Sequence, residues 1–340
     1  MSLFDLWSST DDPTEETPLV DDEPRKEITP SPAPVDRAFR GATRSAAVAD
    51  LVIMGLIGTF LFIRAMPAWH KAGWSFFTEQ EWLPESGRFG IGAVLFGTIL
   101  IALIAMVIAL PLAVGTAICI SELVPDRIRR PLISLIDLMA AIPSIVYALW
   151  GFFFLQPRLI HVAQWLSVHA SWFPPFKVPS GESASAYASS PFIAGTVVSL
   201  VVIPLVCSLT REVFSQAPQG EREAALALGS SQWGMIRTVV LPFGKGGLIG
   251  ASMLGLGRAL GETITVYAII SPIFSRSTHI LETGGNSIAA LIAIRFPDSD
   301  SIGIAALMAA GFVLFMLTLA VNTFAATIIS RSRSGALTEI

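Results

Sequence analysis

Charged residues are scarce in this sequence. Asp, Glu, Lys and Arg make up 14% of the 340 residues, against roughly a quarter in soluble domains. Hydrophobic residues make up 53%, and several apolar runs reach the roughly 20 residues that a helix needs to cross a bilayer. The scarcity of charge therefore argues against a soluble protein and predicts a membrane protein.

Cysteine is also scarce, and the sequence motifs of catalysis are missing. Cys119 and Cys207 both fall in apolar runs, where a packed thiol is expected in place of a disulfide or metal site. His161 and His169 lack an evident third ligand. No Gly-x-x-x-x-Gly-Lys-Ser/Thr loop and no serine-nucleophile or metalloprotease motif occurs. We therefore expect a protein that is not an enzyme and binds no cofactor or metal itself.

The acidic residues are concentrated at the N-terminus. Ten of the 26 Asp and Glu residues lie in residues 1–36, with only two basic residues. Residues 1–44 are also rich in Pro and Thr and lack apolar periodicity, so we expect a disordered tail, which is too acidic for a signal peptide. The interpretation is a tail, residues 1–44, followed by one transmembrane domain, residues 45–340.

Six apolar segments are long enough to span a membrane. They are residues 46–66, 91–120, 131–155, 191–210, 246–271 and 302–330. The Trp-, Phe- and Pro-containing stretch 156–190 is predicted to be an external loop with an interfacial helix. Fourteen Lys and Arg residues fall on the side of the termini and seven on the other, so both termini are expected to be cytoplasmic. The predicted fold class is an all-α, polytopic membrane protein.

The segment between the fourth and fifth predicted spans carries a spaced motif, "EREAALALGSSQWGMIRTVVLPFGKGG". Its fixed positions are Glu223, Ala224, Ala225, Gly229, Val239, Leu241 and Pro242. The pattern predicts a short amphipathic helix that ends at a left-handed glycine, with a second short helix after it. Such a rigid element between two spans would move both when a cytoplasmic partner grips it; an ordinary amphipathic loop is the alternative.

The fifth predicted span contains the charged stretch "GRALGETITVYAII", residues 257–270. In a continuous helix, Arg258 and Glu262 would share one face, with Thr265 about one turn beyond. An arginine at mid-membrane costs about 2.5–3.5 kcal/mol on insertion scales and therefore faces protein or water. The alternatives are a structural pair and a substrate pathway.

As pathway residues, Arg258 and Glu262 suit an oxyanion. A guanidinium matches two oxygens of a phosphate, and the carboxylate accepts a hydrogen bond from a protonated oxyanion. Sulfate carries no proton near neutral pH and would only be repelled by Glu262. The hypothesis is therefore a phosphate pathway.

Glycine and alanine recur every four residues in the same span. The rows are Gly246/Gly250, Gly247/Ala251/Gly255/Ala259 and Gly257/Gly261. Such rows permit close helix packing, either within this chain or against a second subunit.

These motifs resemble those of a known family. The Glu-Ala-Ala motif with its spaced Gly and Leu-Pro is similar to the EAA signature of ABC importer permeases, with Val239 in place of the usual Ile. "GLGRALGET" and "LPLAVGTAICISELVPDRIRRPLISLIDLMAAIPSIVYALWG" resemble segments of the PstC-type permeases of phosphate importers, with Asp137 replacing a glutamate and Ala148 a glycine. The resemblance covers about residues 90–330. Pro143, in the second segment, is expected to bend the third span.

The resemblance implies a type I ABC importer permease in a bacterial cell membrane. It implies a PstA-like second permease, a PstB-like ATPase dimer that binds ATP and Mg, and a PstS-like phosphate-binding protein, with no nucleic acid. It also places Arg258 and Glu262 in the phosphate pathway. We add Thr265 to these pathway residues, and Asp137 as a pathway or packing residue with Arg258 as its candidate partner. Alternatives are a permease for molybdate, sulfate or phosphonate, or an ion-coupled carrier, which would not need the EAA element.

Overall fold

The computed structural model describes residues 34–179, 183–271, 273–274 and 278–333. The chain divides into two compact units, Met1–Gly55 and Leu56–Ile340. In the first unit the described residues are helical and belong to α1 (Pro34–Ala72). The expected tail therefore lies mostly outside the described residues, and residues 34–44 are helical.

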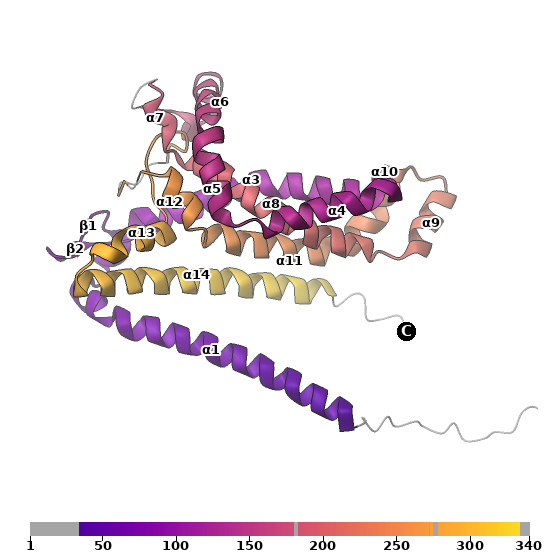
Figure 1. Cartoon of the computed structure of the whole chain (residues 1–340), viewed down its shortest axis with the longest axis horizontal. Helices are drawn as coiled ribbons and strands as arrows, with labels where there is room; N and C mark the ends of the chain where they lie inside the picture. Colours follow the sequence, from indigo (N-terminus) through magenta and orange to yellow (C-terminus); the bar gives the residue numbers. More distant parts are fainter. Residues whose placement is uncertain (1–33, 180–182, 272, 275–277, 334–340) are drawn as a thin grey trace, which may run out of the picture. The chain divides into compact units, whose positions relative to one another are not determined.

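The second unit is built almost entirely from helices (Figure 1). After α1, its elements are α2 (Ser75–Thr78), β1 (Trp82–Leu83), β2 (Arg88–Phe89), α3 (Gly92–Ile118), the π-helical turn η1 (Cys119–Leu123), α4 (Asp126–Ala141), α5 (Ser144–Trp150), the π-helical turn η2 (Gly151–Leu155), α6 (Gln156–His169), the 3-10 turn η3 (Pro174–Phe176), α7 (Ser185–Ala188), α8 (Pro191–Ser215), α9 (Gln219–Ala227), α10 (Gln232–Met235), the π-helical turn η4 (Ile236–Val240), α11 (Leu241–Leu260), α12 (Ile264–Ile269), α13 (Ile288–Arg295), the 3-10 turn η5 (Phe296–Asp298) and α14 (Ser301–Arg333). The two short strands pair antiparallel, with Trp82 opposite Phe89. The predicted all-α class is confirmed.

Within the described residues, six helical segments are long and apolar enough to cross a membrane. They are Val35–Ala72, Gly92–Leu123, Ser144–His169, Pro191–Ser215, Gln232–Leu260 and Ser301–Ile328. The predicted number of spans is confirmed, and five of the six predicted positions overlap these helices along most of their length. The chain is therefore a multi-pass membrane protein.

The third span differs from its prediction because the helix breaks at Pro143. α4 ends at Ala141, and Ile142 is extended with φ −66° and ψ 129°, as expected for a residue before proline. The expected bend is thus a complete break. α4 and α5 both contact α8, whereas α6 runs in a different direction from α4 (Figure 1). The predicted span 131–155 is wrong in position, since the apolar segment begins after the break.

The first part of the predicted external loop is also helical. α6 continues α5 through η2, so residues 156–169 belong to the third candidate span. His169 is engaged within its own helix, because its Nδ1 lies 2.9 Å from the Trp165 carbonyl oxygen and its ring stacks on the Trp165 indole. Across the described part of the chain, no group of three His, Cys, Asp or Glu residues is placed to bind a metal.

The core of the second unit is the contact between α3 and α8. One face of α3 is a row of fully buried alanines: Ala102, Ala105, Ala109, Ala113 and Ala117. On α8, a Cβ at Gly195 would collide with Ile104 of α3. Small side chains on both helices therefore allow a close approach, which gives dispersion contacts in a membrane where the hydrophobic effect gives little.

α11 packs on the same helix α8. A Cβ at Gly244 would collide with Phe214, one at Gly247 with Val213, and one at Gly255 with Val206, all on α8. Ala251 and Ala259 are also buried in this core. The row Gly247/Ala251/Gly255/Ala259 therefore packs within this chain, which decides between the two expected uses for this row.

Enlarging a core alanine is expected to destabilise the helical block. Ala109→Leu places a larger side chain in the fully buried α3 face, and overpacking of this kind costs about 1–3 kcal/mol. Thermal unfolding of the detergent-purified protein should show a lower midpoint for this variant. Val107→Leu, at a position that is 65% exposed on the same helix, serves as the control and should leave the midpoint unchanged; equal midpoints for the two variants would contradict the packing role.

Candidate substrate pathway and coupling segment

The predicted amphipathic helix of the EAA-like motif is α9, which ends at Ala227 and is followed, as expected, by a left-handed glycine, Gly229. Gly229 has φ +84°, and its N–H donates to the Leu226 carbonyl at 3.0 Å. The Ser230 N–H donates to the Ala225 carbonyl at 3.1 Å. These two bonds form a Schellman motif, which satisfies the last carbonyls of the helix and requires the left-handed conformation that glycine adopts without strain.

The second short helix is not separate from the fifth span. Ser231 caps α10, accepting a hydrogen bond from the Gly234 N–H at 3.1 Å, and α10 then runs through η4 into α11 without interruption. Pro242 lies in the first turn of α11 and has no N–H for the preceding turn. The π-helical turn η4 accommodates this missing donor, so Leu241 and Pro242 lie inside one continuous helix.

α9 and the turn after it present apolar side chains to the outside of this chain. Leu228 is 89% exposed and Trp233 is 62% exposed. Ala224 is exposed and Ala225 is half-buried. Glu223 is exposed, and its Oε1 accepts a hydrogen bond from Gln219 Nε2 at 3.3 Å. Large apolar side chains that a chain leaves exposed beside polar ones are candidates for contact with another protein.

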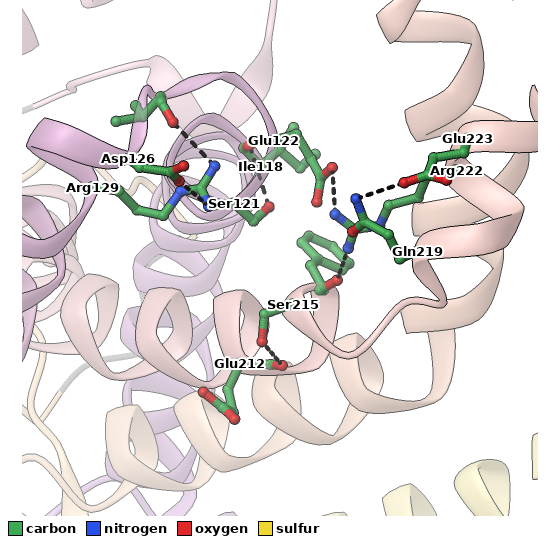
Figure 2. Close-up of polar contacts among 12 residues, drawn as sticks. Ile118, Ser121, Glu122, Asp126, Arg129, Glu212, Ser215, Gln219, Arg222 and Glu223 are labelled. Carbon is green, nitrogen blue, oxygen red and sulfur yellow. Dashed lines mark hydrogen bonds and ion pairs between the residues drawn. The ribbon is translucent and has the colours of Figure 1, made fainter. Parts of the chain in front are cut away.

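The sequence motifs did not predict a buried ion pair that joins α9 to the end of α3. Figure 2 shows Glu122 of η1 and Arg222 of α9 pointing toward one another, with Arg222 Nη1 3.0 Å from Glu122 Oε2. Their side chains are 15% exposed for Arg222 and 3% for Glu122. The signal was present in the sequence as charged residues in the "ISEL" turn and the "EREAA" motif, but nothing in their spacing pairs them.

The predicted helical pairing of Arg258 with Glu262 is wrong. α11 ends at Leu260, and the Gly261 N–H bonds to the Gly257 carbonyl, while the Glu262 N–H bonds to the Ala259 carbonyl three residues back. The helix therefore does not continue between the two charges, and the fifth span stops before residue 271. Because glycine is the weakest helix former after proline, Gly261 favours this end.

Glu262 instead organises the start of α12. Its side chain is buried, and Oε1 accepts hydrogen bonds from the Thr265 backbone N–H at 3.4 Å and from Thr265 Oγ1 at 2.9 Å. Thr265 is fully buried. A carboxylate that accepts a hydrogen bond from the first turn of a helix satisfies a free backbone donor, and its negative charge interacts favourably with the positive end of the helix dipole. The structure thus brings Glu262 and Thr265 together, not on one face of a continuous helix but through hydrogen bonds at the start of α12.

Arg258 lies in the last turn of α11 and is exposed in this chain. Among the described residues, no ion pair joins Arg258 to Glu262 or to Asp137. A guanidinium at the end of an apolar helix that its own chain leaves uncovered must contact water or another protein.

Asp137 lies apart from these residues, on α4. It is exposed, and α4, with 16 residues, is not among the candidate spans. α4 packs against α8. Among the described residues, the expected ion pair between Asp137 and Arg258 is not seen.

The family model and the similar proteins all indicate the same family of transport permeases. Residues 109–334 match the binding-protein-dependent transport system inner membrane component family. The phosphate transport system permease protein PstC 2 of Mycobacterium tuberculosis is 39% identical over 297 residues, covering 86% of this chain and 91% of that protein. The phosphate transport system permease protein PstC of Mesorhizobium japonicum is 34% identical over 305 residues, covering 88% and 92%.

A solved structure shares the fold. It is a bacterial ABC transporter involved in the import of the acidic polysaccharide alginate, with a TM-score of 0.51 and 15% sequence identity, covering 89% of this chain and 100% of that one. At this identity the match supports the arrangement of helices alone.

Substituting Gly229 is expected to loosen the end of α9. Gly229→Ala forces a Cβ into the left-handed region, which costs about 1–2 kcal/mol, although open space surrounds the position. Hydrogen exchange measured by mass spectrometry should be faster at the Gly229 and Ser230 amides. Gly220→Ala, in the first turn of α9 with equally open surroundings and no positive φ, is the control. Unchanged exchange in Gly229→Ala would contradict the capping role.

Proposed function

Because this chain belongs to the binding-protein-dependent transport system inner membrane component family, we propose that it is the membrane-spanning permease subunit of an ATP-driven phosphate importer. The phosphate assignment rests on the PstC relatives, which are 33–39% identical over most of this chain. The protein is a transporter subunit and performs no covalent chemistry itself.

The observation that carries the pathway is the uncovered guanidinium of Arg258 where α11 ends. A second permease subunit, PstA-like, would cover this surface and complete a passage in which Arg258 binds two oxygens of inorganic phosphate. Glu262, capping α12 through Thr265, keeps the helix broken beside Arg258. Its negative charge also disfavours an oxyanion that carries no proton. Asp137 belongs to the same proposal as an exposed charge on α4.

The coupling proposal rests on α9 and the turn after it. Glu223, Ala224 and the exposed Leu228 form a surface for a PstB-like ATPase dimer. In the proposal ATP and Mg bind that partner, since this sequence has no phosphate-binding loop. Because α10, η4 and α11 are continuous, a displacement of α9 is passed along one helix through Leu241 and Pro242 to Arg258. A PstS-like binding protein would deliver phosphate from the opposite side, with both termini cytoplasmic.

Removing the Arg258 charge is expected to abolish phosphate uptake. Arg258→Ala should lower the initial rate of radiolabelled phosphate uptake at least about tenfold, because a hydrogen bond to a charged group is worth about 1.5–3 kcal/mol. Glu262→Gln should raise uptake of sulfate relative to phosphate, since the like-charge repulsion is removed. Cells carrying each variant are compared for phosphate, sulfate and molybdate at matched membrane abundance.

Arg130→Ala, which removes an exposed cation from α4, is the matched control and should retain uptake. Normal phosphate uptake by Arg258→Ala would exclude the pathway role. Wild-type uptake of sulfate or molybdate in place of phosphate would replace the substrate assignment with that oxyanion.

A charge on the exposed face after α9 is expected to release the ATPase. Leu228→Glu places a carboxylate on a side chain that is 89% exposed, where the proposal has the partner covering it, and an unpaired charge buried at an interface costs several kcal/mol. Co-purification of the ATP-hydrolysing subunit should fall. Leu83→Glu, at a position in β1 that is 54% exposed, should leave co-purification intact; equal recovery of the ATPase with both variants would refute the docking surface.

A further inference from the structure

The pair between Glu122 and Arg222 connects elements that lie 100 residues apart in the sequence. Glu122 belongs to η1, the π-helical end of the α3 helix, and Arg222 belongs to α9 (Figure 2). Arg222 also donates from Nη2 to the Phe214 carbonyl of α8 at 2.6 Å. One guanidinium therefore holds together three elements: the end of α3, the end of α8, and α9.

Stability alone is a poor explanation for this pair. Glu122 Oε1 and Arg222 Nε are buried and have no hydrogen-bond partner in the described chain. A buried pair with unsatisfied atoms loses much of its Coulombic gain to desolvation, and apolar residues of similar volume often stabilise a fold as well. Unlike an apolar contact, the ion pair links the end of α3 to α9 with a defined direction and distance.

The link extends beyond α3 into the next helix. Arg129 of α4 donates from Nη2 to the Val124 carbonyl at 3.1 Å and pairs with Asp126 at 2.9 Å. These contacts fix the turn that follows Glu122, so the start of α4 is tied to the end of α3. A displacement of Glu122 therefore reaches both α3, which packs along α8, and α4, which carries Asp137.

We propose that Glu122 and Arg222 are positioning residues that make α3 move together with α9 when the ATPase acts. This inference rests on the proposed coupling role of α9. Without the pair, force on α9 passes to α8 and α11, its neighbours in the sequence, and reaches α3 only indirectly, through the packing of α3 on α8. With it, the α3–α8 core and α4 are driven as one body, and the passage opens and closes with each ATP cycle.

The first test separates coupling from assembly. The complete complex is reconstituted in vesicles, and phosphate transport and ATP hydrolysis are measured together for wild type, Glu122→Gln and Arg222→Gln. Each variant should lower the phosphate transported per ATP by about tenfold, a size typical of coupling between sites, while the complex stays assembled. The swapped double variant, Glu122→Arg with Arg222→Glu, should recover a substantial part of the ratio.

Arg88→Gln is the matched control. It breaks an arginine–glutamate pair between Arg88 of β2 and Glu81, which takes no part in the link between α3 and α9, and it should leave the ratio unchanged. If transport and hydrolysis fall in proportion in Arg222→Gln, or if the ratio stays at the wild-type value, the proposal is overturned.

A second measurement tests, independently of the transported substrate, whether α3 and α9 move together. Spin labels are placed at the exposed Leu123 and Glu221, with Cys119 and Cys207 replaced by alanine. The distance between labels should be the same with and without ATP in the wild-type background, and should change with ATP in Arg222→Gln. A distance that changes equally in both backgrounds refutes the link. If the wild-type complex transports none of phosphate, sulfate and molybdate, the proposed function fails, and the label distances still decide this inference.

Discussion

The structure depends on the cost of exposing charge in a medium with little water. Three charges in or beside the apolar helices differ in their surroundings: Glu262 accepts from the first turn of α12, Glu122 pairs with Arg222, and Arg258 is exposed at the end of α11. The carboxylates of Glu262 and Glu122 have partners inside the chain. The Arg258 guanidinium instead faces water or another protein, and for that reason the proposed pathway is placed at the end of α11.

Small residues determine how those charges are positioned. Alanines on α3 and glycines on α11 bring both helices against α8 so closely that added methyl groups would collide. A block packed in this way transmits displacement with little internal adjustment. The segment proposed to couple, which lies between α8 and α11 in the chain, is therefore attached to a closely packed block, and the Glu122–Arg222 pair links it directly to the end of α3.

Most of the fold could be predicted because its strongest signals are long. Runs of apolar residues specify five of the six spans, and the spacing from Glu223 to Gly229 specifies a helix with a left-handed end. The misplaced third span shows the limit: hydropathy gives no sign that the polar α4 stops at Ala141 and that the membrane segment begins after Pro143. The Glu122–Arg222 pair could not be predicted from the sequence, because the two residues meet only through the tertiary packing of α3, α8 and α9.

The failure of the helical Arg258–Glu262 pair follows from local physics. In a continuous helix, arginine placed four residues before glutamate gains less than the opposite order, and both side chains would still need partners in the membrane. Because α11 ends at Leu260, Glu262 binds Thr265, and no carboxylate among the described residues forms an ion pair with the Arg258 guanidinium. An arginine neutralised by its neighbour would bind an oxyanion weakly. The end of the helix therefore leaves the positive charge of Arg258 exposed, whereas the predicted pairing with Glu262 would have neutralised it.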